Sequence, residues 1–166
     1  MRTLSFALVV SLVASFLLAP AAQAARAVIV IRHAEKASDT EKDPELSLAG
    51  EDRAIALTRF LRHNKIDAIF TSELKRTKDT AGVLARQRSV TPVVVNADDT
   101  KGLVAAIKAL PEDAVVLVVG HSNTVPAILT ELGVPDKISI RDDEFGRVFV
   151  VTPTKSGRSG LLEFGY

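Results

Sequence analysis

Two apolar runs of the chain each end on a histidine. The first, "VIVIRHAEK" at 28–36, places Arg32 and His33 directly after four aliphatic residues, and the second, "VVLVVGHSN" at 115–123, reaches His121. A neutral imidazole nitrogen can attack phosphorus and hold a phosphoryl group until water removes it. A neighbouring guanidinium can bind two oxygens of the same phosphate through its planar fork. The two runs therefore predict a phosphate-binding crevice to which each contributes a histidine.

A third segment, "TSELKRTKDTA" at 71–81, adds a basic residue at helical spacing. If Ser72 caps a helix, Arg76 lies one turn into it and Thr80 a further turn along the same face. The first turns of such helices also carry positive potential that favours an anion. Phosphoryl transfer depends mainly on positioning and charge neutralisation, so we expect no metal and no cofactor. The predicted site consists of Arg32, His33, Arg76 and His121. Asn123 is a further candidate, which either orients His121 or binds substrate, or else caps the helix that follows.

Strand-like and helix-like runs alternate along the chain, which is typical of an α/β protein. We expect a three-layer α/β/α sandwich with a mostly parallel sheet and a late antiparallel hairpin. Four strands are expected in the parallel part, at 28–31, 66–71, 93–95 and 115–119. The hairpin is expected from 147–152 and 161–164, joined by the turn "PTKSGRSG". Ligands of open α/β sheets bind beyond the carboxyl ends of the parallel strands, and the predicted site residues follow three of those ends.

Helix-capping residues mark the expected helix ends. Ser47 is a plausible cap for the helix beginning near "LSLAGEDRA", and Ser72 for the next one. Pro126 fits only the first turn of a helix, and Gly133 suits a helix C-cap. The segment "DDEFGR" at 142–147 is interpreted as an acidic surface turn that could border the site.

The chain has 166 residues, of which 47% are hydrophobic and 25% charged, which fits one ordinary domain. Residues 1–24 have a positive start, an apolar run and an A-x-A pattern, and are interpreted as a signal peptide cleaved after Ala24. The apolar run is too short for a stable membrane anchor. We therefore expect a secreted or periplasmic protein whose single domain is 25–166. With no cysteine, its stability must come from packing.

Without the signal peptide, the domain carries 20 basic and 20 acidic residues, so nothing in its charge predicts a nucleic-acid partner. The expected partner is instead a small phosphorylated substrate or a phosphoprotein. The sequence leaves the choice between them open, together with the oligomeric state.

The motifs resemble those of the histidine phosphatase superfamily. Its Arg-His-Gly signature appears as Arg32-His33-Ala34, and "LSLAGEDRA", "TSELKRTKDTA" and "VVGHSN" follow in the family's order. The resemblance implies that His33 accepts the phosphoryl group and that Arg32, Arg76 and His121 bind the phosphate. Ala34 departs from the glycine of the signature, and we expect its methyl group beside the pocket.

The general acid is not fixed by the resemblance. Ser122 follows His121, which excludes an acid at that place, and Asp98, Asp99 and Glu35 are the candidates. The leading hypothesis is an exported phosphatase that hydrolyses phosphomonoesters through phosphohistidine at His33. The alternatives are a phosphate-binding module with little or no turnover and, more weakly, a phosphotransferase of the phosphoglycerate mutase type.

Overall fold

The computed structural model describes residues 27–154 and 157–166. Within these residues it contains one six-stranded sheet with the strand order β3-β2-β4-β1-β5-β6. The strands are β1 (Ala27–Arg32), β2 (Ala68–Thr71), β3 (Val93–Val94), β4 (Val115–Gly120), β5 (Arg147–Thr152) and β6 (Gly160–Gly165). The helices are α1 (Leu48–Phe60), α2 (Lys75–Arg88), α3 (Thr100–Lys108) and α4 (Thr124–Glu131). The predicted signal peptide, residues 1–24, lies outside the described residues.

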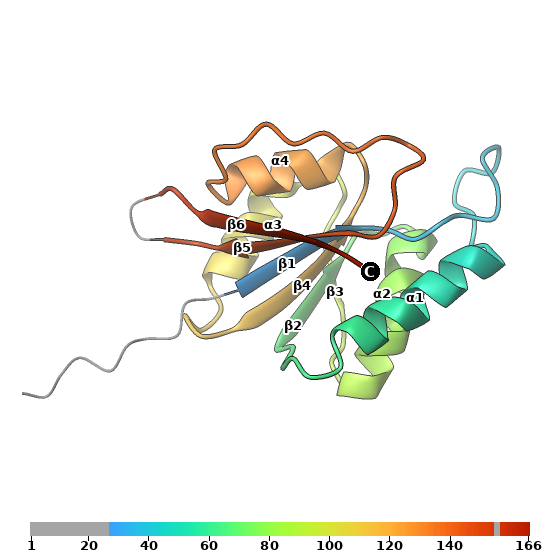
Figure 1. Ribbon diagram of the computed structural model, residues 1–166, viewed down its shortest axis with the longest axis horizontal. Helices are drawn as coiled ribbons and strands as arrows, with labels where there is room; N and C mark the ends of the chain where they lie inside the picture. The colour runs from blue at the N-terminus through green and yellow to red at the C-terminus, as the bar shows by residue number, and fades with distance from the viewer. Residues whose placement is uncertain (1–26, 155–156) are drawn as a thin grey trace, which may run out of the picture.

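The predicted α/β sandwich and its late hairpin are confirmed. Strands β3, β2, β4 and β1 pair in parallel, whereas β5 pairs antiparallel with both β1 and β6. The helices form two pairs, α1 with α2 and α3 with α4, and the pairs lie on opposite faces of the sheet (Figure 1). Two large apolar clusters fill the spaces between the sheet and each pair. Because β1 and β4 are covered on both faces, they read as continuous aliphatic runs.

The start of α1 is the one that the sequence predicts. Ser47 caps it, with its side chain accepting a hydrogen bond from the Gly50 amide at 3.1 Å. Gly50 itself packs against the chain that follows β1, where a Cβ atom would collide with the carbonyl oxygen of Glu35. The glycine therefore lets α1 approach the loop after β1 closely.

The start of α2 differs from the prediction. The helix begins at Lys75 and its N-cap position is Leu74, so Ser72 is not the cap. The hydroxyl of Ser72 accepts a hydrogen bond from the Leu74 amide and also pairs with the hydroxyl of Thr77. Ser72 thus closes a short turn between β2 and α2, and its side chain points back toward the sheet edge.

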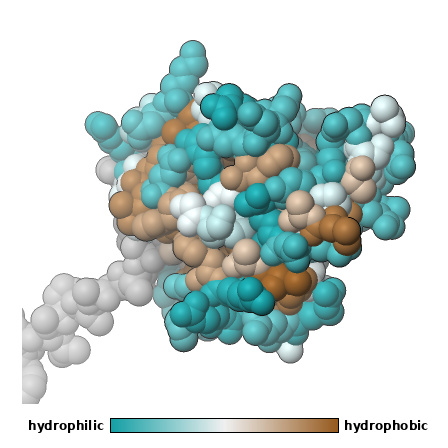
Figure 2. Space-filling model, turned by 45° about the vertical axis from the view of Figure 1, so that its right-hand side comes forward, coloured by the Kyte–Doolittle hydropathy of each residue, from teal (hydrophilic) through white to brown (hydrophobic). Residues whose placement is uncertain are grey.

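The remaining surface shows hydrophobic patches among hydrophilic residues on the face seen in Figure 2. The large hydrophobic side chains that are exposed include Leu162 and Phe164 on β6, the outer strand of the sheet. Among the described residues, no helix has the length and apolar character that crossing a bilayer requires.

Candidate active site

The parallel pairing of β1 with β4 brings two histidines together. Arg32 is in register with Gly120, and the amide of His33 donates to the Gly120 carbonyl at 2.9 Å, so the chain leaves both strands at the same level. The next residues, His33 and His121, therefore lie side by side, with ring centroids 5.2 Å apart and planes inclined by 60°. Both side chains are almost fully buried.

The tautomer of His33 is fixed by the chain that follows it. Its Nδ1 lies 2.7 Å from the carbonyl oxygen of Ala34. A carbonyl oxygen can only accept, so Nδ1 carries the hydrogen and Nε2 keeps its lone pair. Burial lowers the pKa of His33 to about 3 against the opposing effect of this hydrogen bond, and His121, Arg32 and Arg76 lower it further. At neutral pH the imidazole is therefore uncharged, as a nucleophile requires.

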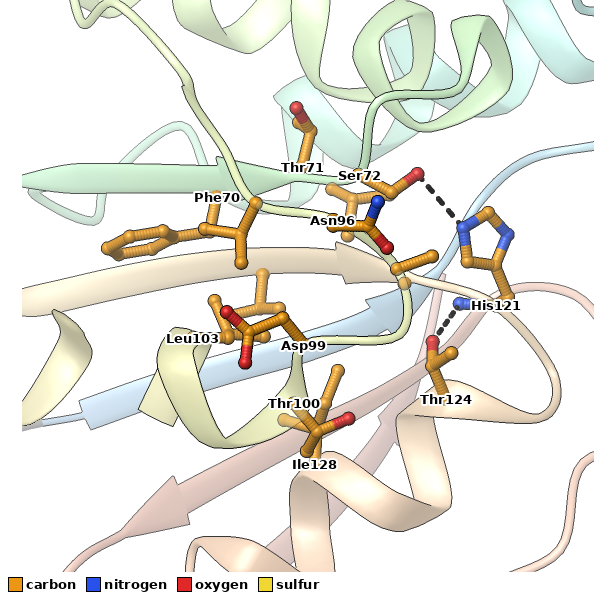
Figure 3. Close-up of a pocket in the computed structure, with 15 residues that line it drawn as sticks. Phe70, Thr71, Ser72, Asn96, Asp99, Thr100, Leu103, His121, Thr124 and Ile128 are labelled. Atoms are coloured by element: carbon orange, nitrogen blue, oxygen red, sulfur yellow. Dashed lines mark hydrogen bonds between the residues drawn. The ribbon is translucent and has the colours of Figure 1, made fainter. Parts of the chain in front are cut away.

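The ring of His121 is held at its other nitrogen. Its Nε2 lies 2.9 Å from the Ser72 hydroxyl, and its amide donates to the Thr124 hydroxyl at 2.9 Å (Figure 3). Its Nδ1 is buried and has no hydrogen-bond partner among the described residues. Burial lowers the pKa of His121 to about 4, with Arg76 and Arg32 acting in the same direction and Glu73 opposing them.

Arg32 connects β1 to the segment before β5. One of its terminal nitrogens, Nη1, donates to three backbone carbonyls, those of Arg141, Asp142 and Glu144, at 2.8 to 3.0 Å. Its guanidinium carbon lies 4.1 Å from the centroid of the Phe145 ring. The Nε atom is buried and unpaired within the described chain. Burial lowers the pKa of Arg32, although neighbouring carboxylates oppose the shift.

Arg76 stands in the first turn of α2, beside the same two histidines. Its Nη1 lies 3.9 Å from a carboxylate oxygen of Asp43, and its Nε is buried with no hydrogen-bond partner in the described residues. Its charge lowers the pKa of both His33 and His121. The structure thus brings together the four residues that the sequence singles out.

The sequence predicts the methyl group of Ala34 beside the pocket, and the structure packs it into an apolar cluster. The residue is fully buried in a separate small apolar cluster with Leu46, Ala54 and the partly buried Val83. The methyl group therefore packs under α1 and α2 and anchors the loop that carries His33. The departure from glycine therefore adds apolar contact.

The three candidates for the general acid have hydrogen-bond partners other than the histidines or are exposed. Glu35 forms a two-pronged ion pair with Arg53, whose Nε lies 2.8 and 2.9 Å from its carboxylate oxygens. Burial tends to raise the pKa of Glu35, but the hydrogen bonds and charge of Arg53 lower it overall. Asp99 caps α3 through the Gly102 amide, and Asp98 is exposed. Within residues 27–154 and 157–166, no hydrogen bond joins these three carboxylates to either histidine.

Asn123 occupies the N-cap position of α4, but its side chain makes no capping hydrogen bond and is exposed. Its role in orienting His121 or binding substrate stays a prediction. No group of three or more histidine, cysteine or carboxylate side chains within the described residues could hold a metal ion.

Several neighbours of the site were not singled out by the sequence. Phe145 comes from the segment interpreted as an acidic surface turn, and this segment supplies the ring and two of the three carbonyls that hold Arg32. Phe145 is the single aromatic residue within that acidic stretch, and this is the sequence feature that could have identified it. No sequence pattern marks Asp43 or Arg53 as a neighbour of the site, because their positions depend on how a polar loop and α1 pack.

Two hollows adjoin the site. One, of about 560 Å³, is lined by Arg32, Glu35, Lys36, Asp39, Asp142 and Phe145 and is strongly polar. The other lies between α3 and the ends of β2 and β4, beyond the Ser72–His121 contact, and its volume is only about 20 Å³ (Figure 3). That volume suits a single water molecule. The larger hollow is the one with room for part of a substrate.

Comparison with known proteins identifies the class. Residues 28–98 match the model of the histidine phosphatase superfamily, branch 1. This match covers the first three motifs, so the resemblance to that superfamily is confirmed. No curated protein matches the sequence.

Solved structures share the fold at low sequence identity. The protein histidine phosphatase SixA complexed with tungstate is 20% identical, with a TM-score of 0.70, and the match covers 84% of this chain and 96% of that chain. A mycobacterial glucosyl-3-phosphoglycerate phosphatase is 15% identical with a TM-score of 0.70, over 84% of this chain and 98% of that chain. The same mycobacterial phosphatase in complex with VO3 is 16% identical with a TM-score of 0.69, over 85% and 99%.

Proposed function

We propose that the protein is an exported phosphatase that hydrolyses phosphomonoesters through a phosphohistidine intermediate on His33. The observation that carries the proposal concerns the three residues that share the site with His33. Each of them has a buried nitrogen without a hydrogen-bond partner among the described residues. The Nε atoms of Arg32 and Arg76 and the Nδ1 of His121 are all of this kind within the described chain. Buried polar groups are nearly always paired in folded proteins. A tetrahedral oxyanion can pair with several such nitrogens at once.

In the first step, the Nε2 lone pair of His33 attacks phosphorus. The nitrogen–phosphorus bond forms as the ester oxygen–phosphorus bond breaks, and the bonding electrons leave with the ester oxygen. Arg32 and Arg76 neutralise the charge that spreads over the other phosphate oxygens. The Ala34 carbonyl keeps its hydrogen bond to Nδ1 and stabilises the positive charge that develops on the ring.

In the second step, water attacks phosphorus from the side that the leaving group has vacated. The nitrogen–phosphorus bond breaks and its electrons return to Nε2 of His33. The water loses a proton to the solvent, which balances the negative charge released with the leaving group, and inorganic phosphate leaves. An activated leaving group such as p-nitrophenolate departs without needing a proton, so this substrate tests the nucleophile independently of the general acid.

The substrate side of the proposal is supported by the solved relatives. Tungstate and VO3 are phosphate-like oxyanions, and the SixA and mycobacterial structures contain them. The relatives are named as phosphatases of protein histidine and of glucosyl-3-phosphoglycerate. We infer a phosphorylated protein or a small phosphoester as substrate, with its leaving group in the polar hollow beside Arg32.

The covalent mechanism is tested with p-nitrophenyl phosphate in the presence of a chelator. The wild-type protein should hydrolyse it, and His33→Ala should reduce kcat at least 10³-fold. His63→Ala is the matched control, because His63 is an exposed histidine at the end of α1, and it should retain full activity. Full activity in His33→Ala would exclude the covalent mechanism. Vanadate binding without any phosphate release would instead support a binding module.

Export is tested separately by expressing the whole chain in a bacterium. The protein recovered from the periplasm or medium should have the mass of residues 25–166. Recovery of the uncleaved chain from the cytoplasm alone would contradict export and leave the mechanism untouched.

A further inference from the structure

We propose that Thr80 is a positioning residue that holds the imidazole of His33 in its reactive tautomer and orientation. The inference rests on the proposed function of His33 and assigns a role to a residue on a different element. Thr80 belongs to α2, and its side chain is fully buried.

Two hydrogen bonds through Ala34 connect Thr80 to His33, and a third connects Thr80 to Arg76. The Thr80 hydroxyl donates to the Arg76 carbonyl at 2.6 Å and accepts from the Ala34 amide at 2.9 Å. The carbonyl of Ala34 accepts from Nδ1 of His33 at 2.7 Å. The direction of every bond is fixed, because carbonyl oxygens only accept and amides only donate. Ala34 is thus held at both its amide and its carbonyl.

The bond from Ala34 distinguishes Thr80 from an ordinary helical threonine. Threonines inside helices often donate to the carbonyl four residues earlier, and this alone would be local to α2. At Ala34, however, β1 has ended, and the amide lies in a fully buried residue. The Thr80 hydroxyl is the partner that this amide has. Without the hydroxyl, a buried amide would be left unpaired next to the reactive histidine.

The same hydroxyl also couples the turn of α2 that carries Arg76 to the loop that carries His33. Arg76 lies about one helical turn before Thr80, and its carbonyl accepts the hydrogen bond from the Thr80 hydroxyl. The turn of α2 that presents Arg76 and the loop that presents His33 are therefore held in one register by one oxygen atom. A small rotation of the Ala34 peptide would weaken the hydrogen bond that holds Nδ1 of His33 and let the ring turn.

Two variants and one matched control test the role. Thr80→Val keeps the shape of the side chain and removes the hydroxyl, whereas Thr80→Ser keeps the hydroxyl. Thr58→Val is the control, because Thr58 in α1 is also buried and makes the same type of bond, to the Ala54 carbonyl at 3.0 Å, away from the site. We expect kcat for p-nitrophenyl phosphate to fall at least tenfold in Thr80→Val, with KM changed less than threefold. Thr80→Ser and Thr58→Val should stay within threefold of wild type.

The second readout is the tautomer of His33, measured by the ¹⁵N chemical shifts of its ring. In the wild-type protein and in Thr80→Ser the hydrogen should be on Nδ1, and in Thr80→Val the two tautomers should mix. Wild-type kcat together with unchanged ring shifts in a folded Thr80→Val would overturn the proposal. If that variant does not fold, Thr80→Ala is measured in its place under the same criteria.

This design separates the two levels of inference. If the wild-type protein releases no phosphate from any ester, the proposed function fails, but the ring shifts still decide whether Thr80 fixes the tautomer. If His33→Ala abolishes hydrolysis and Thr80→Val leaves both kcat and the ring shifts unchanged, the proposed function stands and the role of Thr80 is rejected.

Discussion

The imidazoles of His33 and His121 meet edge to face, 5.2 Å between centroids, in a buried space that also receives two arginines. Four potential positive charges so close together would repel one another strongly at low dielectric. The two histidines relieve this by staying neutral, since burial lowers the pKa of His33 to about 3 and that of His121 to about 4. The arginines then carry the positive charge, and the histidines provide lone pairs.

The stability of the protein should fall between pH 6.5 and 4 because of these two residues. In the unfolded chain each histidine takes up a proton near its ordinary value of 6.5, while the folded protein leaves both uncharged until much lower pH. The unfolded state therefore binds more protons in this range, and the free energy of unfolding decreases as pH falls. At pH 5 the loss is roughly 1–2 kcal/mol for each histidine.

Urea denaturation at pH 7 and pH 5 measures this effect. The drop in unfolding free energy should be smaller in His33→Asn and in His121→Asn than in the wild type, because each variant removes one titrating group. His63→Asn serves as the exposed control and should match the wild type. Equal drops in all four proteins would show that the two buried histidines are not the source.

Two helical glycines should respond in opposite ways to alanine. In Gly50→Ala the new methyl group would meet the Glu35 carbonyl, so we expect a loss of about 1–3 kcal/mol from overpacking. In Gly82→Ala, within α2, the nearest atom is the flexible end of Arg86 at 3.3 Å. The higher helix propensity of alanine should then stabilise this variant by up to about 1 kcal/mol. Thermal unfolding of both variants checks the pair, and a neutral Gly50→Ala would contradict the close approach of α1.

Arg32→Lys should weaken the fold as well as the site. A lysine has one ammonium group and cannot reproduce a guanidinium that donates to three carbonyls and packs on Phe145. We expect a loss of about 1–3 kcal/mol in the free energy of unfolding, together with a large drop in kcat. Arg59→Lys, at an exposed position of α1, is the control and should change neither. Wild-type stability of Arg32→Lys would mean that the carbonyl contacts contribute little.

Glu35→Gln distinguishes a structural carboxylate from a general acid. Because Arg53 lowers the pKa of Glu35, this carboxyl is ionised at neutral pH and has no proton to donate. The variant should lose stability through the weakened ion pair but keep kcat within threefold for a poor leaving group such as an alkyl phosphate. A hundredfold drop confined to poor leaving groups would instead identify Glu35 as the acid.

The sequence predicts the fold and the convergence of the site because both depend on local signals. The aliphatic runs ending on His33 and His121 identify central parallel strands, and pairing those strands in parallel is enough to bring the histidines together. The Ser47 cap follows from local chemistry in the same way. These features need no knowledge of how distant loops pack.

What the sequence does not predict depends on packing between distant segments. Ser72 looks like a helix cap, yet its hydroxyl lies 2.9 Å from the His121 ring, because a residue 49 positions away competes for it. The methyl group of Ala34 enters an apolar cluster with Leu46 and Ala54, whose location depends on the approach of α1. The general acid is left open for the same reason, since carboxylates in polar loops carry no periodic pattern.

The hydrogen bonds from Arg32 join residues that are 109 to 112 positions apart in the chain. Such non-local contacts form late, because the loop-closure entropy must be overcome before they are made. During synthesis, His33 leaves the ribosome long before the segment around Phe145 exists. The nascent chain therefore carries the proposed nucleophile before the proposed phosphate site is complete, and that site is completed only when β5 docks antiparallel beside β1.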